Sequence, residues 1–285
     1  MSSKTLIIGC GYAGLPLALQ LQERGHEITA WVRSTDSAAQ LAAHAFSQVI
    51  TGSVGDEDRW KNLGGKFDLV IHCASSGRGG VEAYEEVFLQ GARLMHAHQP
   101  EARRLMVSST SVYGQTEGET VTEDSPAEPA SATSRMLREA EKEAMASGAT
   151  VVRSSGIYGP GRSVLFEKFR RGEAVIEGDG LRWINQIHQR DLVAALAHLI
   201  EAGAPGQVYN ATDNTPVTQR DFYAWCAGFL HQPLPPSGPL NLERKRGLTN
   251  KRVSNAKLRA TGWSPVYPSF REGLAADCGG DRSLS

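Results

Sequence analysis

The sequence predicts an α/β fold, in which a doubly wound parallel sheet carries a smaller C-terminal lobe. Three observations lead to it. An apolar strand at residues 5–8 runs into a glycine-rich turn and then an amphipathic segment. Up to residue 153, apolar strands alternate with amphipathic helices, which is the pattern of right-handed βαβ units. Beyond residue 153 the chain is rich in Gly, Pro and Arg loops, which is typical of a lobe that covers a substrate.

The remaining elements follow from apolar runs and capping residues. Ser34 or Thr35 can cap a helix over residues 36–46, and Thr218 caps one over 222–230. Asp191 is most simply a helix cap as well. The last thirteen residues are expected to be less ordered. Further strands are expected at 27–33, 48–52, 68–75, 105–109, 149–153 and 207–210, and further helices at 56–63, 81–98, 131–147 and 187–200.

The first turn reads G-x-G-x-x-G, with glycines at positions 9, 11 and 14. Gly9 permits a tight turn, Gly11 lets backbone N–H groups approach a pyrophosphate, and Gly14 lets the helix pack against the sheet. The pyrophosphate is expected at the helix N-terminus, where free N–H groups and the helix dipole favour an anion. Alone the motif is weak, since any glycine-rich turn can match it. After a strand and before a helix, it predicts a dinucleotide site.

This assignment divides the chain. Residues 1–153 form the expected dinucleotide-binding Rossmann domain, and segments 187–210 return to it. Residues 154–186 and 211–285 form the smaller substrate-binding lobe.

The second strand indicates which dinucleotide binds. An acidic residue about 20 positions beyond the glycines usually accepts the ribose hydroxyls of NAD. Here the strand ends in Arg33 and Ser34, with no carboxylate. An arginine can bind a 2′-phosphate through two donors, so we expect NADP rather than NAD. The alternative is that Arg33 is simply an exposed residue at a strand end.

Composition excludes several classes of protein. The 285 residues carry a net charge of −1, which implies no attraction to nucleic acid or to a membrane surface. The four cysteines lack a C-x-x-C pair or metal-ligand spacing, so we expect no metal and a reducing, cytoplasmic compartment. Short basic clusters such as Arg103-Arg104 are expected to be solvated or to contact a local phosphate.

A longer series of motifs resembles a known family, the extended short-chain dehydrogenase/reductases, which include NAD-dependent nucleotide-sugar epimerases and dehydratases. The landmarks are the glycine turn, the strand V-I-H-C-A, the run S-S-T-S-V-Y-G and, later, R-S-S-G-I-Y-G-P-G-R and I-H-Q-R-D-L. The resemblance covers nearly the whole chain and is closest to atypical bacterial members. It implies a nucleotide-sugar-like or other carbonyl or hydroxyl substrate, and a homodimer.

The resemblance also assigns site residues. Ser109 falls at the catalytic serine or threonine, which hydrogen-bonds the reacting oxygen; a small residue ending a strand is the alternative. Other positions implied to bind the cofactor are Tyr12, Ala13, Cys73, Ala74, Ser75 and Ser108. Positions implied to bind substrate are Tyr158, Arg162, Asn185 and His188. A structural turn is equally compatible with Tyr158 and Arg162, and a structural histidine with His188.

One family feature is missing. In the family a Tyr-x-x-x-Lys pair moves a proton while hydride passes to or from the nicotinamide. Aligning Glu141 with the family's acidic residue places Thr133 and Leu137 at these two positions. Loss of a positioned acid/base costs about 10²–10⁴-fold in rate. Two replacements from this chain are conceivable: Arg135 or Arg138 pointing into the site, although arginine cannot act as a base near neutral pH, and Tyr158 or His188 donating protons from the opposite wall of the cleft.

Two functions therefore stay open. The first is an NADP-dependent oxidoreductase or epimerase-like protein that uses Ser109. The second is a non-catalytic NADP-binding redox sensor or regulatory protein.

Overall fold

The computed structural model describes residues 2–77, 79–240 and 248–280. Its centre is a seven-stranded parallel sheet in the order β12-β7-β5-β4-β1-β2-β3. The predicted α/β fold with a doubly wound parallel sheet is confirmed. The strands of this sheet are β1 (Lys4–Ile8), β2 (Glu27–Val32), β3 (Gln48–Thr51), β4 (Leu69–His72), β5 (Arg103–Ser109), β7 (Thr150–Ser154) and β12 (Val208–Ala211).

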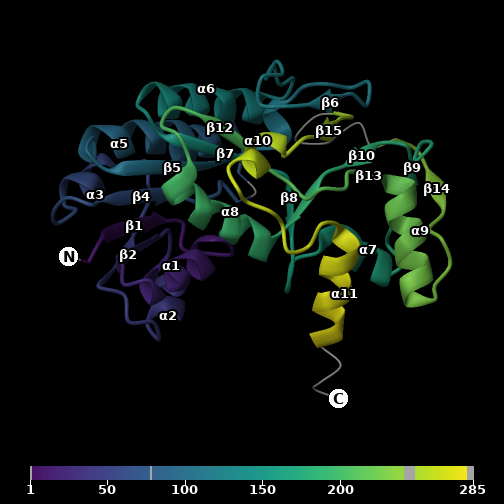
Figure 1. Ribbon diagram of the computed structural model, residues 1–285, viewed down its shortest axis with the longest axis horizontal. Coiled ribbons are helices and arrows are strands. Elements are labelled where there is room, and N and C mark those ends of the chain that lie inside the picture. Colours follow the sequence, from purple (N-terminus) through teal and green to yellow (C-terminus); the bar gives the residue numbers. More distant parts are fainter. Residues whose placement is uncertain (1, 78, 241–247, 281–285) are drawn as a thin grey trace.

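Helices cover both faces of the sheet, and each layer buries its own apolar cluster (Figure 1). One face carries α1 (Gly14–Glu23), α2 (Thr35–Leu41) and α8 (Gln189–Ala202). The other carries α3 (Glu57–Lys61), α4 (Val81–Tyr84), the π-helix η1 (Glu85–Gln90), α5 (Gly91–His98) and α6 (Ala132–Ala146). The carboxyl ends of β1, β2, β4 and β5 therefore meet along one edge, where α/β proteins bind ligands.

A smaller lobe lies beyond that edge, on the right of Figure 1, around a third apolar cluster that includes Phe222, Tyr223 and Phe270. Its helices are α7 (Val164–Arg170), α9 (Gln219–Leu230) and α11 (Phe270–Gly280). Short paired strands complete it and join it to the main domain: β8 (Gly156–Tyr158) with β11 (Gln186–His188), β9 (Ile176–Glu177) with β14 (Ser237–Gly238), β10 (Trp183–Ile184) with β13 (Val217–Thr218), and β6 (Thr120–Val121) with β15 (Arg252–Val253). The turn η2 (Thr110–Val112) follows β5, and α10 (Ala256–Ala260) packs near β12.

The helix expected over 81–98 is present, as the contiguous segments α4, η1 and α5. Within η1, the Nε2–H of buried His72 donates to the Val87 carbonyl at 2.8 Å. A wider turn frees such a carbonyl for a partner outside the helix. Two other expectations about local structure were wrong. The disorder expected from residue 273 does not hold as far as Gly280, because Phe270 and Leu274 bury α11 in the lobe core. Asp191 does not cap α8; His188 does, through Nδ1.

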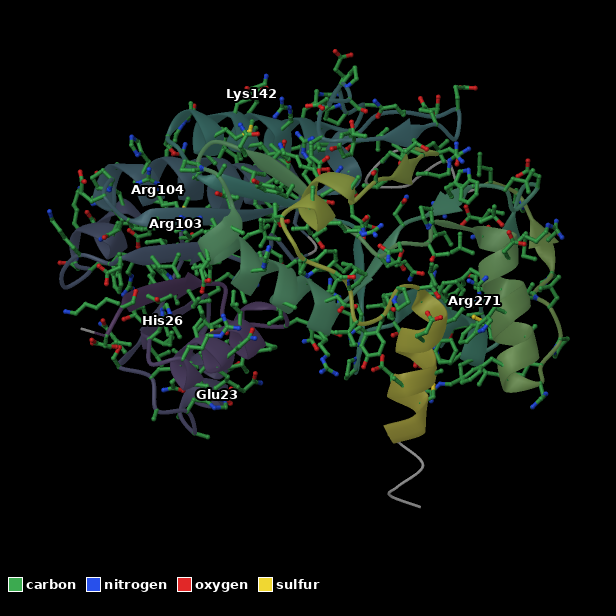
Figure 2. The ribbon with its side chains drawn as sticks, in the orientation of Figure 1. Glu23, His26, Arg103, Arg104, Lys142 and Arg271 are labelled. Atoms are coloured by element: carbon green, nitrogen blue, oxygen red, sulfur yellow. The ribbon has the colours of Figure 1, made fainter. Side chains whose placement is uncertain are left out.

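The Arg103-Arg104 cluster is not solvated either. Arg103 donates to the carbonyls of Leu199 and Gly203 at the end of α8, and Arg104 donates to those of Gln99 and Ser147 after α5 and α6. Figure 2 shows both arginines on the main domain, far from Arg271 of the lobe. They satisfy carbonyl groups that a helix end leaves without partners. Within the described residues, no helix is long and apolar enough to cross a bilayer.

Candidate cofactor and substrate site

The glycine turn lies at the carboxyl edge of the sheet, between β2 and β4. Gly9 N donates to the Trp31 carbonyl at 2.8 Å, and Cys73 N donates to the Ile8 carbonyl at 2.7 Å. The helix α1 begins at Gly14 and points its first N–H groups towards this edge. Leu15 N already donates to the Gly11 carbonyl at 2.9 Å, and Pro16 has no N–H. The N–H groups of Tyr12, Ala13 and Gly14 have no recorded acceptor among the described residues, so an anion can bind them.

The three motif glycines differ in how much space a Cβ atom would have at each position. Gly9 has φ +82°, and a Cβ there would lie 2.3 Å from the Ala74 backbone. A Cβ on Gly14 would lie 2.3 Å from the Gly9 carbonyl oxygen. A Cβ on Gly11 would meet nothing within 4 Å. Packing therefore explains Gly9 and Gly14, whereas at Gly11 the absence of a side chain leaves open space beside the turn.

Arg33 and Ser34 follow β2 as predicted, and both are exposed. Ser34 Oγ accepts from Ser37 N at 3.2 Å and so caps α2, as expected. Among the described residues the structure records no hydrogen bond or ion pair for Arg33. Its guanidinium can therefore bind a ligand at this strand end without breaking an existing contact.

At the end of β4, Cys73 and Ala74 pack beneath the glycine turn, and Ser75 is exposed. Burial, and to a lesser extent the nearby Cys10, raises the pKa of the Cys73 thiol to about 12. The thiol is therefore protonated at neutral pH and unreactive.

The two serines that end β5 have different surroundings. Ser109 is half-buried, and its Oγ accepts from Ser111 N at 3.2 Å. Ser108 is buried, and its Oγ donates to Glu141 Oε1 at 2.6 Å. Ser108 thus belongs to an internal network, and this geometry does not favour the predicted cofactor contact of its side chain.

The buried hydrogen-bond network around Glu141 was not predicted from the sequence. Glu141 also accepts from Arg153, whose Nη1 donates to Tyr113 Oη at 2.8 Å; Tyr113 Oη in turn donates to Asn210. Burial disfavours the Arg153 cation, but its bonds to Glu141 outweigh burial and raise the pKa of Arg153. The sequence feature that could have indicated this network is the position of Glu141 on the buried face of α6, beside Leu137, Ala140 and Ala144.

The structure does not bring the four predicted substrate residues together at one place. Tyr158 and His188 lie together in the lobe, edge to face with ring centroids 5.2 Å apart. Tyr158 is 2% exposed and donates to the Ser269 carbonyl, while His188 contacts Asp277 Oδ1 at 3.2 Å. Burial is the main reason that the pKa of the Tyr158 phenol is raised, so it holds its proton. Both side chains have structural contacts, and the substrate role of each remains a prediction.

Asn185 bridges two backbone groups. Its amide donates to the Lys251 carbonyl at 2.9 Å and accepts from Val253 N at 2.7 Å. Lys251 itself is buried and donates from Nζ to the Tyr113 carbonyl at 2.8 Å. Burial lowers the pKa of Lys251 to about 8. Asn185 therefore holds the backbone of residues 251–253, from which Lys251 reaches the segment that follows Ser109.

Arg162 lies against the glycine turn rather than beside Tyr158. Its Cζ is 5.1 Å from the centre of the Tyr12 ring, and Tyr12 Oη donates to the Pro160 carbonyl at 3.2 Å. The loop that carries Arg162 thus closes over Tyr12. The structure brings this predicted substrate residue to a predicted cofactor residue.

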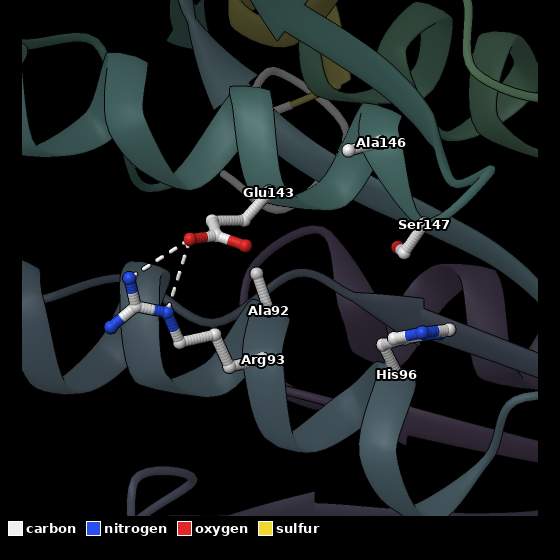
Figure 3. A pocket seen from close by; sticks show the side chains of 6 residues that line it. All are labelled: Ala92, Arg93, His96, Glu143, Ala146 and Ser147. Atoms are coloured by element: carbon white, nitrogen blue, oxygen red, sulfur yellow. Dashed lines mark hydrogen bonds and ion pairs between the residues drawn. The ribbon is translucent and has the colours of Figure 1, made fainter.

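Thr133 and Leu137 both lie on α6, one turn apart. Leu137 is 2% exposed and packs in the apolar cluster of that face. A separate pocket opens between α5 and α6 (Figure 3) and contains none of the predicted site residues. It is lined by Ala92, Arg93, His96, Glu143, Ala146 and Ser147, with an Arg93–Glu143 ion pair of 2.8 Å. No cluster of metal-ligating side chains occurs in the described parts of the chain.

Known proteins share this architecture. The model of the NAD-dependent epimerase/dehydratase family matches residues 5–212. Protein YeeZ of Escherichia coli K12 is 28% identical over 235 residues, which cover 80% of this chain and 84% of YeeZ. A solved candidate NAD-dependent epimerase/dehydratase from Methylobacillus flagellatus is 30% identical, with a TM-score of 0.79 over 99% of this chain and 100% of that one.

A more distant structure has the same fold. The dTDP-glucose 4,6-dehydratase of Bacillus anthracis in complex with NAD is 17% identical, with a TM-score of 0.81 over 100% of this chain and 98% of the other. The glycine turn, the sheet order and the family match thus agree. The chain belongs to the NAD-dependent epimerase/dehydratase family.

Proposed function

We propose that this protein binds NADP and acts as an oxidoreductase or epimerase-like enzyme on a nucleotide-sugar-like substrate with a reacting hydroxyl or carbonyl group. The observation that carries the cofactor choice is the free guanidinium of Arg33 at the end of β2, where an NAD-binding protein usually has a carboxylate. The Bacillus anthracis dehydratase holds NAD, but at 17% identity it does not decide the question for this chain.

The residues of the turn fit a dinucleotide. Gly11 leaves open space beside the N-terminus of α1, and the N–H groups there can bind the pyrophosphate. When bound, NADP supplies the nicotinamide that accepts or donates a hydride. The protein's own part is to hold the cofactor and the substrate oxygen.

Ser109 is the residue suited to hold that oxygen. Its Oγ accepts from Ser111 N, and its hydroxyl hydrogen has no recorded acceptor among the described residues. A serine hydroxyl can accept and donate at once, so this hydrogen is available to a substrate oxygen. Ser109 binds and orients, and we assign no residue to the proton transfer.

The test of cofactor binding is the substitution Gly11→Ala. It is expected to weaken both NADPH and NADH at least tenfold without loss of stability, because the new methyl group meets no protein atom. Gly64→Ala is the matched control, since a Cβ there also meets nothing within 4 Å. If the unaltered protein binds neither NADPH nor NADH, the proposal fails.

The second candidate is a non-catalytic NADP-binding sensor. It is favoured by Leu137, an uncharged, buried side chain at the position where the family has its lysine. A turnover screen against nucleotide sugars separates the two. Turnover that Ser109→Ala abolishes and Ser111→Ala retains supports the enzyme, whereas tight NADPH binding with no turnover supports the sensor.

A further inference from the structure

We propose that Arg59 is a second specificity residue, which binds the 2′-phosphate of NADP together with Arg33. This inference rests on the proposed cofactor. The side chain of Arg59 lies across Gly52, the residue after β3. A Cβ built on Gly52 would be 3.0 Å from Arg59 Nε and 3.5 Å from Cζ. Gly52 also has φ +133°, which L side chains rarely adopt. Glycine at this position therefore lets the guanidinium lie against the strand end.

The Gly52 backbone beneath Arg59 and the strand end that carries Arg33 belong to neighbouring strands. Val32 pairs with Thr51 in the parallel ladder between β2 and β3, and Gly52 N donates to the Val32 carbonyl at 3.0 Å. Adjacent strands lie about 4.8 Å apart. Arg33 thus follows one strand end, and Arg59 covers the next. The 2′-hydroxyl side of the adenosine ribose is bound at this edge in dinucleotide folds.

Two buried tryptophans hold this edge in place. Trp31 Nε1 donates to the Gly52 carbonyl at 3.0 Å, and Trp60 Nε1 donates to the Val54 carbonyl at 2.7 Å. The two rings are in contact, with centroids 5.0 Å apart. Trp60 is the residue after Arg59, so its burial fixes the backbone that directs Arg59 over Gly52. An arginine positioned in advance loses less entropy when it binds a phosphate.

The acidic residues at the start of α3 leave most N–H donors of Arg59 free to bind a ligand. Asp56 is its one recorded carboxylate partner among the described residues, at 3.6 Å, and both side chains are about half exposed. Such a pair is weak and screened by solvent. Asp56 Oδ1 already accepts from Asp58 N as the cap of α3, while Glu57 and Asp58 pair with Lys61. Arginine has five N–H donors, so most of those on Arg59 are available to a phosphate dianion.

The experiment compares Arg59→Gln, Arg59→Lys, Arg33→Gln and Lys61→Gln with the unaltered protein. The ligands are NADPH and NADH, and also 2′,5′-ADP and 5′-AMP, which differ from each other only in the 2′-phosphate. Arg59→Gln is expected to weaken NADPH and 2′,5′-ADP about tenfold and to leave NADH and 5′-AMP within twofold. Arg59→Lys is expected to lose less of the affinity for NADPH and 2′,5′-ADP, because it keeps the positive charge. Lys61→Gln removes an exposed cation from the same helix, and it is expected to leave the affinity for all four ligands unchanged.

The outcomes separate this inference from the proposed function. If the unaltered protein prefers NADPH and Arg33→Gln removes that preference while Arg59→Gln does not, Arg59 has no such role and the proposed function stands. An equal loss for NADPH and NADH in Arg59→Gln would also overturn the inference, because it would indicate general damage to the site. If the unaltered protein shows no preference for NADPH, the proposed cofactor choice fails as well.

Discussion

Arg153 donates two hydrogen bonds to Glu141, from Nε to Oε1 at 2.9 Å and from Nη2 to Oε2 at 2.7 Å. The two side chains are 2% and 0% exposed, and they join β7 to α6 beneath the candidate site. Arg138, which is 24% exposed, also pairs with Glu141 at 3.1 Å. Removing Arg153 therefore leaves the buried Glu141 carboxylate with this one cation, and removing Glu141 leaves the buried Arg153 cation without a recorded carboxylate partner in the described chain. Glu141→Leu or Arg153→Met alone should therefore lower the free energy of unfolding by about 3–5 kcal/mol.

The double variant Glu141→Leu with Arg153→Met should lose less than the sum of the two single variants, because neither charge is then stranded. Urea unfolding of the four proteins measures this coupling. Single variants that each lose under about 1 kcal/mol would show that the pair is not a stabilising element of the core.

Asp213 should make the protein less stable as the pH rises. Its carboxyl is 2% exposed; Oδ1 accepts from Thr215 N at 3.0 Å, and Oδ2 has no partner among the described residues. Burial raises the pKa of Asp213 from 3.8 to about 8. Between these values the unfolded chain releases a proton that the folded chain keeps, so stability falls by up to about 1.4 kcal/mol per pH unit.

Asp213→Asn removes this titration while keeping the shape of the side chain. Its stability relative to the unaltered protein should rise from pH 5 to pH 8 in thermal unfolding. The exposed Asp124→Asn is the control and should show no such trend. A difference between Asp213→Asn and the unaltered protein that stays constant with pH would contradict the assignment.

His72 should make the protein less stable as the pH falls, the opposite of the effect expected for Asp213. Burial lowers its pKa below the ordinary 6.5, Nε2–H donates to Val87, and Nδ1 has no partner within the described chain. Below pH 6.5 the unfolded chain binds a proton that the folded chain does not, so stability is lost as the pH falls. In His72→Gln, denaturant midpoints between pH 5 and 7 should depend less on pH than in the unaltered protein. His96→Gln, on the exposed side of α5, should retain the full dependence.

Local patterns predicted the elements whose causes are local. The glycine turn, the Ser34 cap of α2 and the Thr218 cap of α9 each depend on residues within a few positions, and all are present. The features that were not predicted depend on contacts between residues that are distant in the sequence. The Asp191 carboxylate, which from sequence alone looks like a cap, accepts from Val266 N and Tyr267 N, 75 and 76 residues away. No periodicity in the sequence encodes such a pairing.

The same distinction applies to the site. Arg33 could be proposed from the sequence because a strand end and a missing carboxylate are visible there. Arg59 could be proposed only from the structure, because its position over Gly52 depends on the pairing of β2 with β3 and on two buried tryptophans. Likewise, Ser108 and Ser109 are neighbours in the sequence, but they point to opposite surroundings because side chains alternate along a strand.

Leu137 offers a last test, of whether this position belongs to the core or to the cofactor site. In the structure it is 2% exposed and packs with Val112, Ala140 and Ala144. Leu137→Lys would bury an unpaired ammonium, so we expect it to lower the free energy of unfolding by at least about 3 kcal/mol. Leu137→Met, which keeps volume and polarity, should cost less than about 1.5 kcal/mol. Both are measured by urea unfolding with and without NADPH. If Leu137→Lys costs less than about 1 kcal/mol and binds NADPH more tightly, residue 137 faces the cofactor, and the lysine of the family has been restored rather than a core residue lost.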